Sequence, residues 1–244
     1  MELQTVKMLI ARLLLAIVEV SFGVPEAIFR TVGGVLAIAR VRLHHSYDYR
    51  VWLARDLTGC QSILELGCGR NSPILQIGLG DFTDAVDIWQ PYVDKHNVDG
   101  TYRSCECQDI IEMDLGENQY DAVVILDVLE HLDRKKVRDT DLFARMLKAA
   151  KKKVIIFVPN GFIENDHVDG DPYQAHISAW EPDDYLRRGY EVHGATGMRW
   201  ILGKASLPKW HPFSFWAIVA MVSQPYIYNH PKWAWHSYAV KKVK

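Results

Sequence analysis

Apolar runs and amphipathic segments alternate along the chain from residue 61 onward. The runs that we expect to form strands lie at residues 63–66, 84–88, 101–105, 120–128, 153–160, 190–196 and 237–242. Helices are expected from Pro73, from Pro91 and over about 133–150, where apolar residues recur at helical spacing. Uninterrupted apolar strands are typical of parallel strands that are covered on both faces. The pattern therefore predicts a doubly wound α/β sheet.

Residues 1–58 lack this alternation and are expected to be helical, in three pieces broken near residues 23–25 and 44–46. The most apolar piece is Met8 to Val20, whose longest uncharged run, Leu13 to Val18, has only six residues. A membrane-spanning helix needs about 20 residues, and no small-residue cleavage site follows this piece. We therefore expect a helical N-terminal extension, followed by one domain over residues 59–244.

Two later segments also depart from the alternation. Residues 159–182 form a long predicted loop with three prolines, and loops of this length are often functional. Residues 197–234 are a tryptophan-rich insertion, within which residues 210–231 contain no Asp, Glu, Lys or Arg. We interpret the insertion, together with the N-terminal helices, either as a lid over a pocket, with the aromatic residues buried, or as a peripheral membrane contact.

The composition is that of an ordinary globular protein, with 49% hydrophobic residues, 24% charged residues and a net charge of -2. This charge balance argues against general nucleic-acid binding. Cys60, Cys68, Cys105 and Cys107 show neither a CxxC pair nor the spacing of a zinc site. We expect reduced thiols and a cytoplasmic protein.

The stretch SILELGCGRNSP, residues 62–73, predicts a buried strand, a glycine turn and a helix start. Ser72 and Pro73 are typical of the first positions of a helix. Gly67 and Gly69 allow a positive φ and a close approach of a ligand to the backbone. A dinucleotide-binding turn has a third glycine where this chain has Ser72. The turn indicates a nucleotide-type ligand, or a turn whose glycines serve the backbone alone.

Polar residues lie at or just after the ends of the predicted strands. They are Glu65, Asp87, Asp109, Asp127 and Asn160. Each of them alone is also typical of a cap or a turn, but ligands of an open α/β sheet bind at this edge. Asp87 lies 18 residues beyond Gly69, near the position expected for an acid that binds ribose hydroxyls.

Five motifs follow one another in the order LELGCGRNSP, VDIWQPYV, QDIIEM, YDAVVILDVLEHL and VIIFVPNGF. Their order and spacing resemble class I S-adenosylmethionine-dependent methyltransferases, particularly the small-molecule type that includes ubiquinone-biosynthesis O-methyltransferases. The resemblance covers about residues 60–196. It implies S-adenosylmethionine as the cofactor and a mostly parallel seven-stranded Rossmann-like sheet of order 3-2-1-4-5-7-6.

The resemblance also implies the residues of the cofactor site. It places the methionine part beside Glu65, Gly67 and Gly69, the ribose on Asp87, the adenine beside Asp109 and Ile110, and the amino-acid end near Asp127, with Cys68 and Ile88 in the same site. An adenosyl sulfonium carries no phosphate, so the missing third glycine agrees with this cofactor.

The candidate catalytic residues are His131 and His176, with His167 as a further candidate in the long loop. A positioned base of this kind speeds methyl transfer to a hydroxyl or an amine. In the resembled O-methyltransferases an acid-x-x-Glu-His segment can hold a divalent metal, and residues 127–131 match that pattern. Because the same residues are also typical of helix packing and capping, we assign no metal from the sequence.

These observations predict S-adenosylmethionine-dependent methyl transfer to a small-molecule or lipid-like acceptor, at an oxygen, carbon or nitrogen atom. The alternative is a non-catalytic partner subunit that keeps the fold, and a third interpretation is the same fold with other chemistry, such as aminopropyl transfer. The acids Glu65, Asp87 and Asp109 favour a functional site, because a subunit without activity has no physical need for them.

Overall fold

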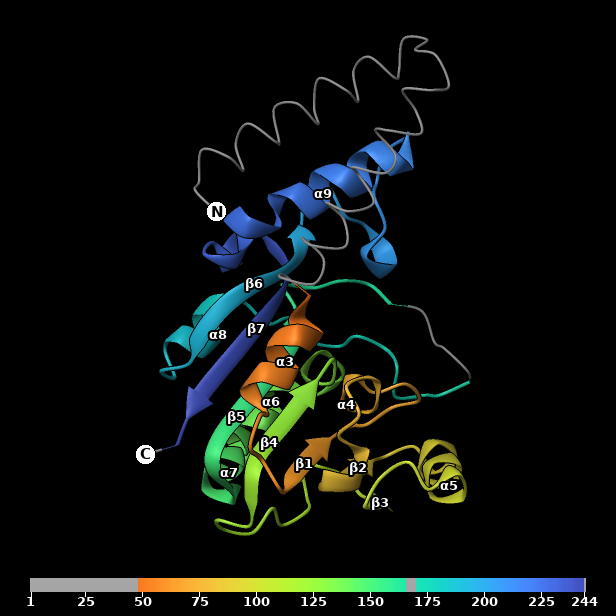
Figure 1. The fold of residues 1–244 in the computed structure, drawn as a ribbon, viewed down its shortest axis with the longest axis vertical. Coiled ribbons are helices and arrows are strands. Elements are labelled where there is room, and N and C mark those ends of the chain that lie inside the picture. Colours follow the sequence, from red (N-terminus) through yellow and green to blue (C-terminus); the bar gives the residue numbers. More distant parts are fainter. Residues whose placement is uncertain (1–47, 166–169, 244) are drawn as a thin grey trace.

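The computed structural model describes residues 48–165 and 170–243 of the chain. In this part of the chain, one seven-stranded sheet has the order β3-β2-β1-β4-β5-β7-β6 (Figure 1). The strands are β1 Ile63–Leu66, β2 Thr83–Asp87, β3 Ser104–Cys107, β4 Tyr120–Leu126, β5 Ala150–Pro159, β6 Glu191–Met198 and β7 Ala234–Lys242. The predicted helices before residue 48 and the candidate His167 lie outside the described residues.

The strand directions confirm the predicted mostly parallel, doubly wound sheet. Strands β1 to β5 pair in parallel, and β7 pairs antiparallel with both β5 and β6. The third strand, however, begins at Ser104 and not at Thr101. Thr101 bonds through its hydroxyl to the ring of His96, at 2.8 Å, so this residue still belongs to the turn that leaves the preceding helix.

The helices of the described residues are α3 Tyr49–Asp56, α4 Pro73–Gln76, α5 Gln90–Asp99, α6 Arg134–Asp139, α7 Leu142–Ala149, α8 Pro182–Leu186 and α9 Phe213–Tyr228. Short 3-10 turns are η1 Gly80–Phe82, η2 Leu129–His131, η3 Lys204–Ser206 and η4 Pro231–Trp233. The single helix expected over 133–150 is wrong, because it is divided into α6 and α7. Asp141 lies between them with φ +45° and caps α7 by accepting a hydrogen bond from the Ala144 N–H.

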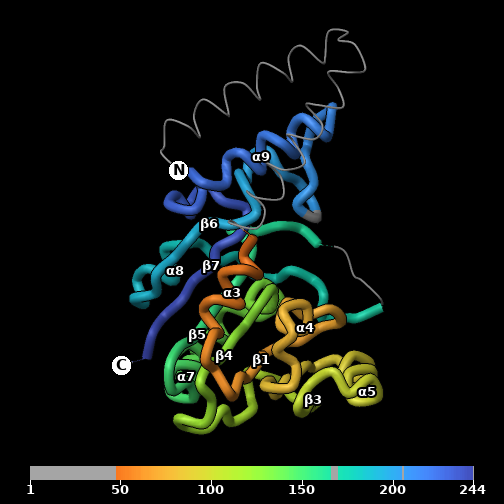
Figure 2. The backbone as a smooth tube through the Cα atoms, in the orientation of Figure 1, coloured from red at the N-terminus to blue at the C-terminus, as the bar shows by residue number. Residues whose placement is uncertain are grey.

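Helices cover both faces of the sheet (Figure 2). Successive side chains of a strand point to opposite faces, and β1 shows this clearly. Ile63 belongs to the same apolar cluster as Trp52 of α3, whereas Leu64 belongs to the cluster of Phe143 and Met146 of α7. The strand ends that carry the predicted site therefore rest on two packed layers.

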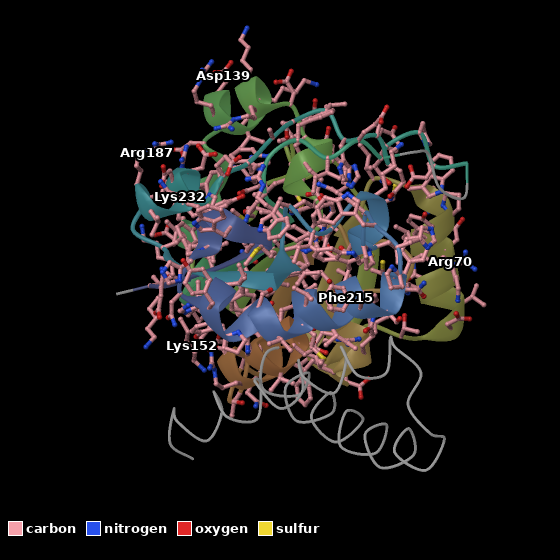
Figure 3. The ribbon with its side chains drawn as sticks, turned by 90° about the horizontal axis from the view of Figure 1, so that it is seen from above. Arg70, Asp139, Lys152, Arg187, Phe215 and Lys232 are labelled. Carbon is pink, nitrogen blue, oxygen red and sulfur yellow. The ribbon has the colours of Figure 1, made fainter. Side chains whose placement is uncertain are left out.

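The tryptophan-rich insertion between β6 and β7 contains α9, which packs against β6. Figure 3 shows this helix from above, with Phe215 on it. Gly197 of β6 has φ +91°, and a Cβ at this position would lie only 2.8 Å from the carbonyl oxygen of Ala220. A glycine is therefore required where the strand and the helix meet.

The aromatic side chains of this region differ in their exposure. Trp235 is buried, whereas Trp200, Trp210 and Trp233 are 46%, 42% and 54% exposed. The predicted lid also includes the N-terminal helices, which lie outside the described residues, so the choice between a lid and a membrane contact stays a prediction. Among the described residues, no helix has the length and the apolar character needed to cross a membrane.

Candidate active site

The glycine turn after β1 begins the site, and its shape depends on packing. Gly67 and Gly69 have φ values of +77° and +55°. A Cβ on Gly67 would lie 2.5 Å from the Cγ2 atom of Val128, whereas a Cβ on Gly69 would meet no atom within 4 Å. Ser72 caps α4 as predicted, since its hydroxyl accepts a hydrogen bond from the Ile74 N–H at 2.9 Å. Gly67 therefore serves the contact with Val128, and Gly69 leaves open space.

Glu65 lies inside β1 and is 1% exposed. One of its carboxylate oxygens accepts a hydrogen bond from the Ser72 hydroxyl, and the other accepts one from the Tyr102 hydroxyl at 2.9 Å. Burial raises the pKa of Glu65 to about 8. Because both oxygens already have partners, this carboxyl stabilises the glycine turn through its bonds to Ser72 and Tyr102.

Asp87 ties the glycine turn to the end of β2. One of its carboxylate oxygens accepts a hydrogen bond from the Gly69 N–H at 2.8 Å, and the other accepts one from the Trp89 N–H at 2.9 Å. Burial raises the pKa of Asp87, and these two N–H groups lower it again in part. Each carboxylate oxygen has a second lone pair, so Asp87 retains capacity for a ligand hydroxyl.

A cavity of about 250 Å³ lies at the carboxyl edge of the sheet, and we call it the cofactor cavity. The predicted cofactor residues that line it are Gly67, Gly69, Asp87, Ile88, Asp109, Ile110 and Asp127. The other two predicted residues, Glu65 and Cys68, border a neighbouring hollow together with Asp127. The Cys68 thiol itself is directed toward that of Cys105, with the two sulfur atoms 3.9 Å apart. The structure thus gathers at one edge the residues that the sequence placed there.

Asp127 lies where the cofactor cavity meets a second cavity. Its backbone has φ +53°, and its N–H donates to the carbonyl oxygen of Phe157 at 2.8 Å. The side chain faces the cavities, and desolvation by the surrounding protein raises its pKa to about 7. A cationic ligand group beside this carboxyl would stabilise its charged form.

The second cavity has a volume of about 230 Å³, and we call it the acceptor cavity. It brings together both predicted catalytic histidines, His131 and His176, whose ring centres are 4.7 Å apart. The Nδ1 atoms of these rings face the carbonyl oxygens of Ala175 and Ile163, at 3.2 and 2.6 Å. A carbonyl oxygen only accepts hydrogen bonds, so each Nδ1 carries the proton and each Nε2 keeps a lone pair.

Burial sets the charge of these two rings. It lowers the pKa of His131 to about 4, and the neighbouring His176 adds to this effect. Burial also lowers the pKa of His176. Both rings are therefore neutral near pH 7 and present nitrogen lone pairs to a ligand.

Glu130 adds a buried carboxyl to the acceptor cavity. It is 2% exposed, and its Oε2 atom has no hydrogen-bond partner. Burial, together with the neighbouring Asp127, raises the pKa of Glu130 well above its usual range. An unpaired buried oxygen of this kind is costly unless a ligand satisfies it.

Glu130, His131 and His176 form a set that fits a divalent cation. Each offers one donor atom, and the three donor atoms lie within 4.8 Å of one another. Two neutral imidazoles and a carboxylate are a common donor set for such ions, with coordination positions left for a substrate or water. The fit includes Glu130 and His131 of the motif at residues 127–131, and it adds His176 from the long loop.

His236 is a residue of the acceptor cavity that the sequence analysis missed. Its ring stacks on Phe157 at 4.5 Å, its Nδ1 lies 2.8 Å from the Thr196 hydroxyl, and its Nε2 lies 3.6 Å from Asp127 Oδ1. Burial, followed by the neighbouring His176, lowers the pKa of His236 to about 3. The sequence signal was weak, because only the register that places His236 opposite Pro159 brings it to this edge.

Residues 64–158 match the sequence pattern of the family described as "Methyltransferase domain". Residues 64–158 thus form a methyltransferase domain, and the sheet of the described residues has the strand order expected from the resemblance to class I S-adenosylmethionine-dependent methyltransferases. No curated protein shows significant sequence similarity to the chain.

Solved structures share the fold of this methyltransferase domain. A SAM-dependent methyltransferase from Archaeoglobus fulgidus superposes with a TM-score of 0.50 at 17% sequence identity, covering 83% of this chain and 98% of its own. The [4+2]-cyclase SpnF gives a TM-score of 0.50 at 13% identity and covers 80% of each chain. At these identities the likeness concerns the fold alone.

The residues of the cofactor cavity fit S-adenosylmethionine, the cofactor that the sequence resemblance implies. The carboxylate of Asp87 could accept hydrogen bonds from a ribose diol, and that of Asp127 could pair with an ammonium group. Ile88 and Ile110 line the cavity with apolar side chains. A dinucleotide-binding turn has a third glycine under its phosphates. Because S-adenosylmethionine has no phosphate, the turn beside Gly69 does not need this third glycine. The methyltransferase reaction then depends on what the acceptor cavity holds.

Proposed function

We propose that the enzyme transfers a methyl group to an oxygen, nitrogen or carbon atom of a small-molecule or lipid-like acceptor bound in the acceptor cavity. One observation carries this proposal: Asp127, His131 and Gln174 line both the cofactor cavity and the acceptor cavity. A methyl donor in the first cavity and an acceptor in the second would therefore meet at a shared wall.

The proposal assigns the cofactor residues as follows. Asp87, with Ile88 beside it, holds the ribose hydroxyls, and Asp109, with Ile110, borders the adenine. Asp127 pairs with the amino-acid end. Glu65 and Cys68 act indirectly, because Glu65 is bonded to Ser72 and Tyr102 and the Cys68 thiol is directed toward Cys105.

The bound cofactor supplies a methyl group on a sulfonium, which is already an excellent leaving group. The main task of the chain is therefore to orient the acceptor, and well-oriented reactants gain effective molarities on the order of 10⁵ to 10⁸ M. The Nε2 atoms of His131 and His176 accept a hydrogen bond or the proton of the acceptor group. The low pKa of His131, about 4, makes this ring a weak base and favours positioning over proton removal.

A divalent cation held by Glu130, His131 and His176 would supply a second means of activation, since a bound cation lowers the pKa of a coordinated hydroxyl. The unpaired Oε2 atom of Glu130 supports this version of the site. In either version the residues around the acceptor cavity stay neutral or paired, which suits an acceptor that is itself uncharged.

The test uses methyl-labelled cofactor with aqueous and lipid extracts as sources of acceptor. We expect labelled product, and we expect the His176→Ala variant to lose about 10²-fold or more in turnover with S-adenosylhomocysteine affinity within about twofold of wild type. His230→Ala is the matched control, because His230 is exposed and its ring contacts Tyr226 at the surface.

Two outcomes would contradict the proposal. If His176→Ala transfers methyl at the wild-type rate, the acceptor does not react beside this ring. If the wild-type protein binds the cofactor but no labelled product forms from any extract, the fold serves another chemistry or a non-catalytic role. The cyclase with the same fold shows that methyl transfer does not follow from the fold.

A further inference from the structure

A third hollow, of about 300 Å³, lies between the start of α3, the end of β6 and α9. We call it the α9 hollow. Residues from all three elements and from the segment before α9 line it, among them Tyr49, Thr196, Leu202, Pro208, Ala217 and Met221. It lies apart from the cofactor cavity, with which it shares no lining residue.

Several polar groups in the wall of the α9 hollow are bonded within the protein. Gln224 accepts a hydrogen bond from the Gly197 N–H and donates one to the Gly194 carbonyl oxygen, both at 2.8 Å. Asp48 is paired with Arg50. What these groups leave for a ligand is mainly aliphatic and aromatic surface, which favours an apolar occupant.

The α9 hollow adjoins the acceptor cavity. Ser206 lines both. Aromatic rings also connect them: Tyr49 of the hollow stacks on Phe157 at 3.8 Å, and Phe157 stacks on His236 of the acceptor cavity at 4.5 Å. A molecule whose reacting group lies beside His236 would therefore reach the α9 hollow by a path past Ser206, away from the cofactor cavity.

Apolar side chains also gather on the segment that borders this path. Trp200, Leu207, Trp210 and Phe213 are 46%, 64%, 42% and 50% exposed. The rings of Trp200 and Trp210 lie 5.9 Å apart, and both contact Trp216 of α9. Such a cluster offers a long hydrocarbon chain further surface where it leaves the hollow.

We propose that the α9 hollow binds a hydrocarbon chain of the methyl acceptor. The acceptor is then an amphiphile, with its reacting polar group in the acceptor cavity and its chain along α9. This inference rests on the proposed function and narrows it to one class of substrate. Two observations carry it: the two cavities meet at Ser206, and Gln224, Asp48 and Arg50 of the hollow are paired within the protein.

The test measures how ligand affinity depends on chain length in the full-length protein. The probes are para-ethylphenol, para-butylphenol and para-hexylphenol, titrated by calorimetry in the presence of saturating S-adenosylhomocysteine. We expect the dissociation constant to fall by about fourfold for each added methylene, which corresponds to about 0.8 kcal/mol per buried CH₂. Because binding is measured, this experiment gives a result even if the phenols are not methylated.

Two tryptophan substitutions locate the chain. Ala217→Trp fills the hollow from an exposed position on α9 and should abolish the gain with chain length. Ala144→Trp, at an exposed position on α7 that lines none of the three cavities, is the matched control and should keep the gain. Both variants should bind S-adenosylhomocysteine as wild type does, which shows that they are folded.

Either of two results overturns the inference. If the affinity of the wild-type protein does not change with chain length, the hollow does not take the chain, for instance because another segment of the protein occupies it. If Ala217→Trp keeps the full gain, the chain binds elsewhere. Failure of the proposed function has a different signature: the gain with chain length persists, but no labelled methyl product forms.

Discussion

Replacing Asp87 by asparagine should weaken both cofactor binding and the fold of the turn. In the wild-type protein each carboxylate oxygen of Asp87 accepts one backbone hydrogen bond, from Gly69 at 2.8 Å and from Trp89 at 2.9 Å. The substitution keeps one oxygen and puts an NH₂ group in place of the other. One of the two N–H groups then faces a donor, and the negative charge is lost.

The two effects have estimable sizes. A hydrogen bond to a charged group contributes about 1.5–3 kcal/mol, so the loss of one such bond in the turn should lower the free energy of unfolding by about that amount. The ribose should lose a bond of similar strength, because Asp87 would no longer offer two charged oxygens. The dissociation constant for S-adenosylhomocysteine should therefore rise by about 10- to 150-fold.

Calorimetry with S-adenosylhomocysteine and urea unfolding measure these two quantities. Asp84→Asn is the matched control on the same strand, because Asp84 pairs with Arg103 near the surface. It should leave the affinity unchanged and cost at most about 1 kcal/mol. If Asp87→Asn binds with wild-type affinity, the ribose assignment is wrong; if its free energy of unfolding equals that of wild type, the role of Asp87 in the turn is wrong.

Three further predictions concern buried groups of the site. The pKa of Glu65 is about 8 in the folded protein against an ordinary 4.5, so between these pH values the folded form keeps a proton that the unfolded chain has lost. The free energy of unfolding should therefore fall by roughly 5 kcal/mol as the pH rises from about 4.5 to 8. In urea unfolding, the Glu65→Gln variant should lack this dependence on pH. Gly67→Ala should cost about 1–3 kcal/mol in thermal unfolding, and Val128→Ala in the same chain should restore part of it, because a Cβ would lie 2.5 Å from the Val128 side chain. Wild-type protein should bind Co²⁺ in a calorimetric titration, and Glu130→Gln should bind it roughly tenfold more weakly or worse; equal affinities would show that Glu130 is not a ligand.

The sequence predicted the features that depend on local pattern. The apolar run at residues 63–66 forms a fully buried strand, and the Ser72 cap and Pro73 begin a helix where expected. Asp87 ends its strand and faces Gly69, as the spacing between the two residues indicated. These features follow from propensity and short-range chemistry, which a single chain displays directly.

The sequence did not predict which residues contact these positions, because the contacting residues come from elements that are distant along the chain. Glu65 is bonded to Tyr102, 37 residues away, and Gly67 is constrained by Val128. His236 enters the acceptor cavity only through the register of β7 beside β5. No periodicity encodes such contacts, so the sequence predicted the positive φ of Gly67, which the structure confirms, but not its contact with Val128.

The sequence predicted the residues of the cofactor cavity better than those of the acceptor cavity. The family pattern covers residues 64–158, which supply all of the predicted cofactor residues. The acceptor cavity takes Ile163, His176, Trp235 and His236 from beyond that range. Under the proposed function, we therefore expect residues 159–243 to determine which acceptor binds, because they supply most of the residues that line the acceptor cavity.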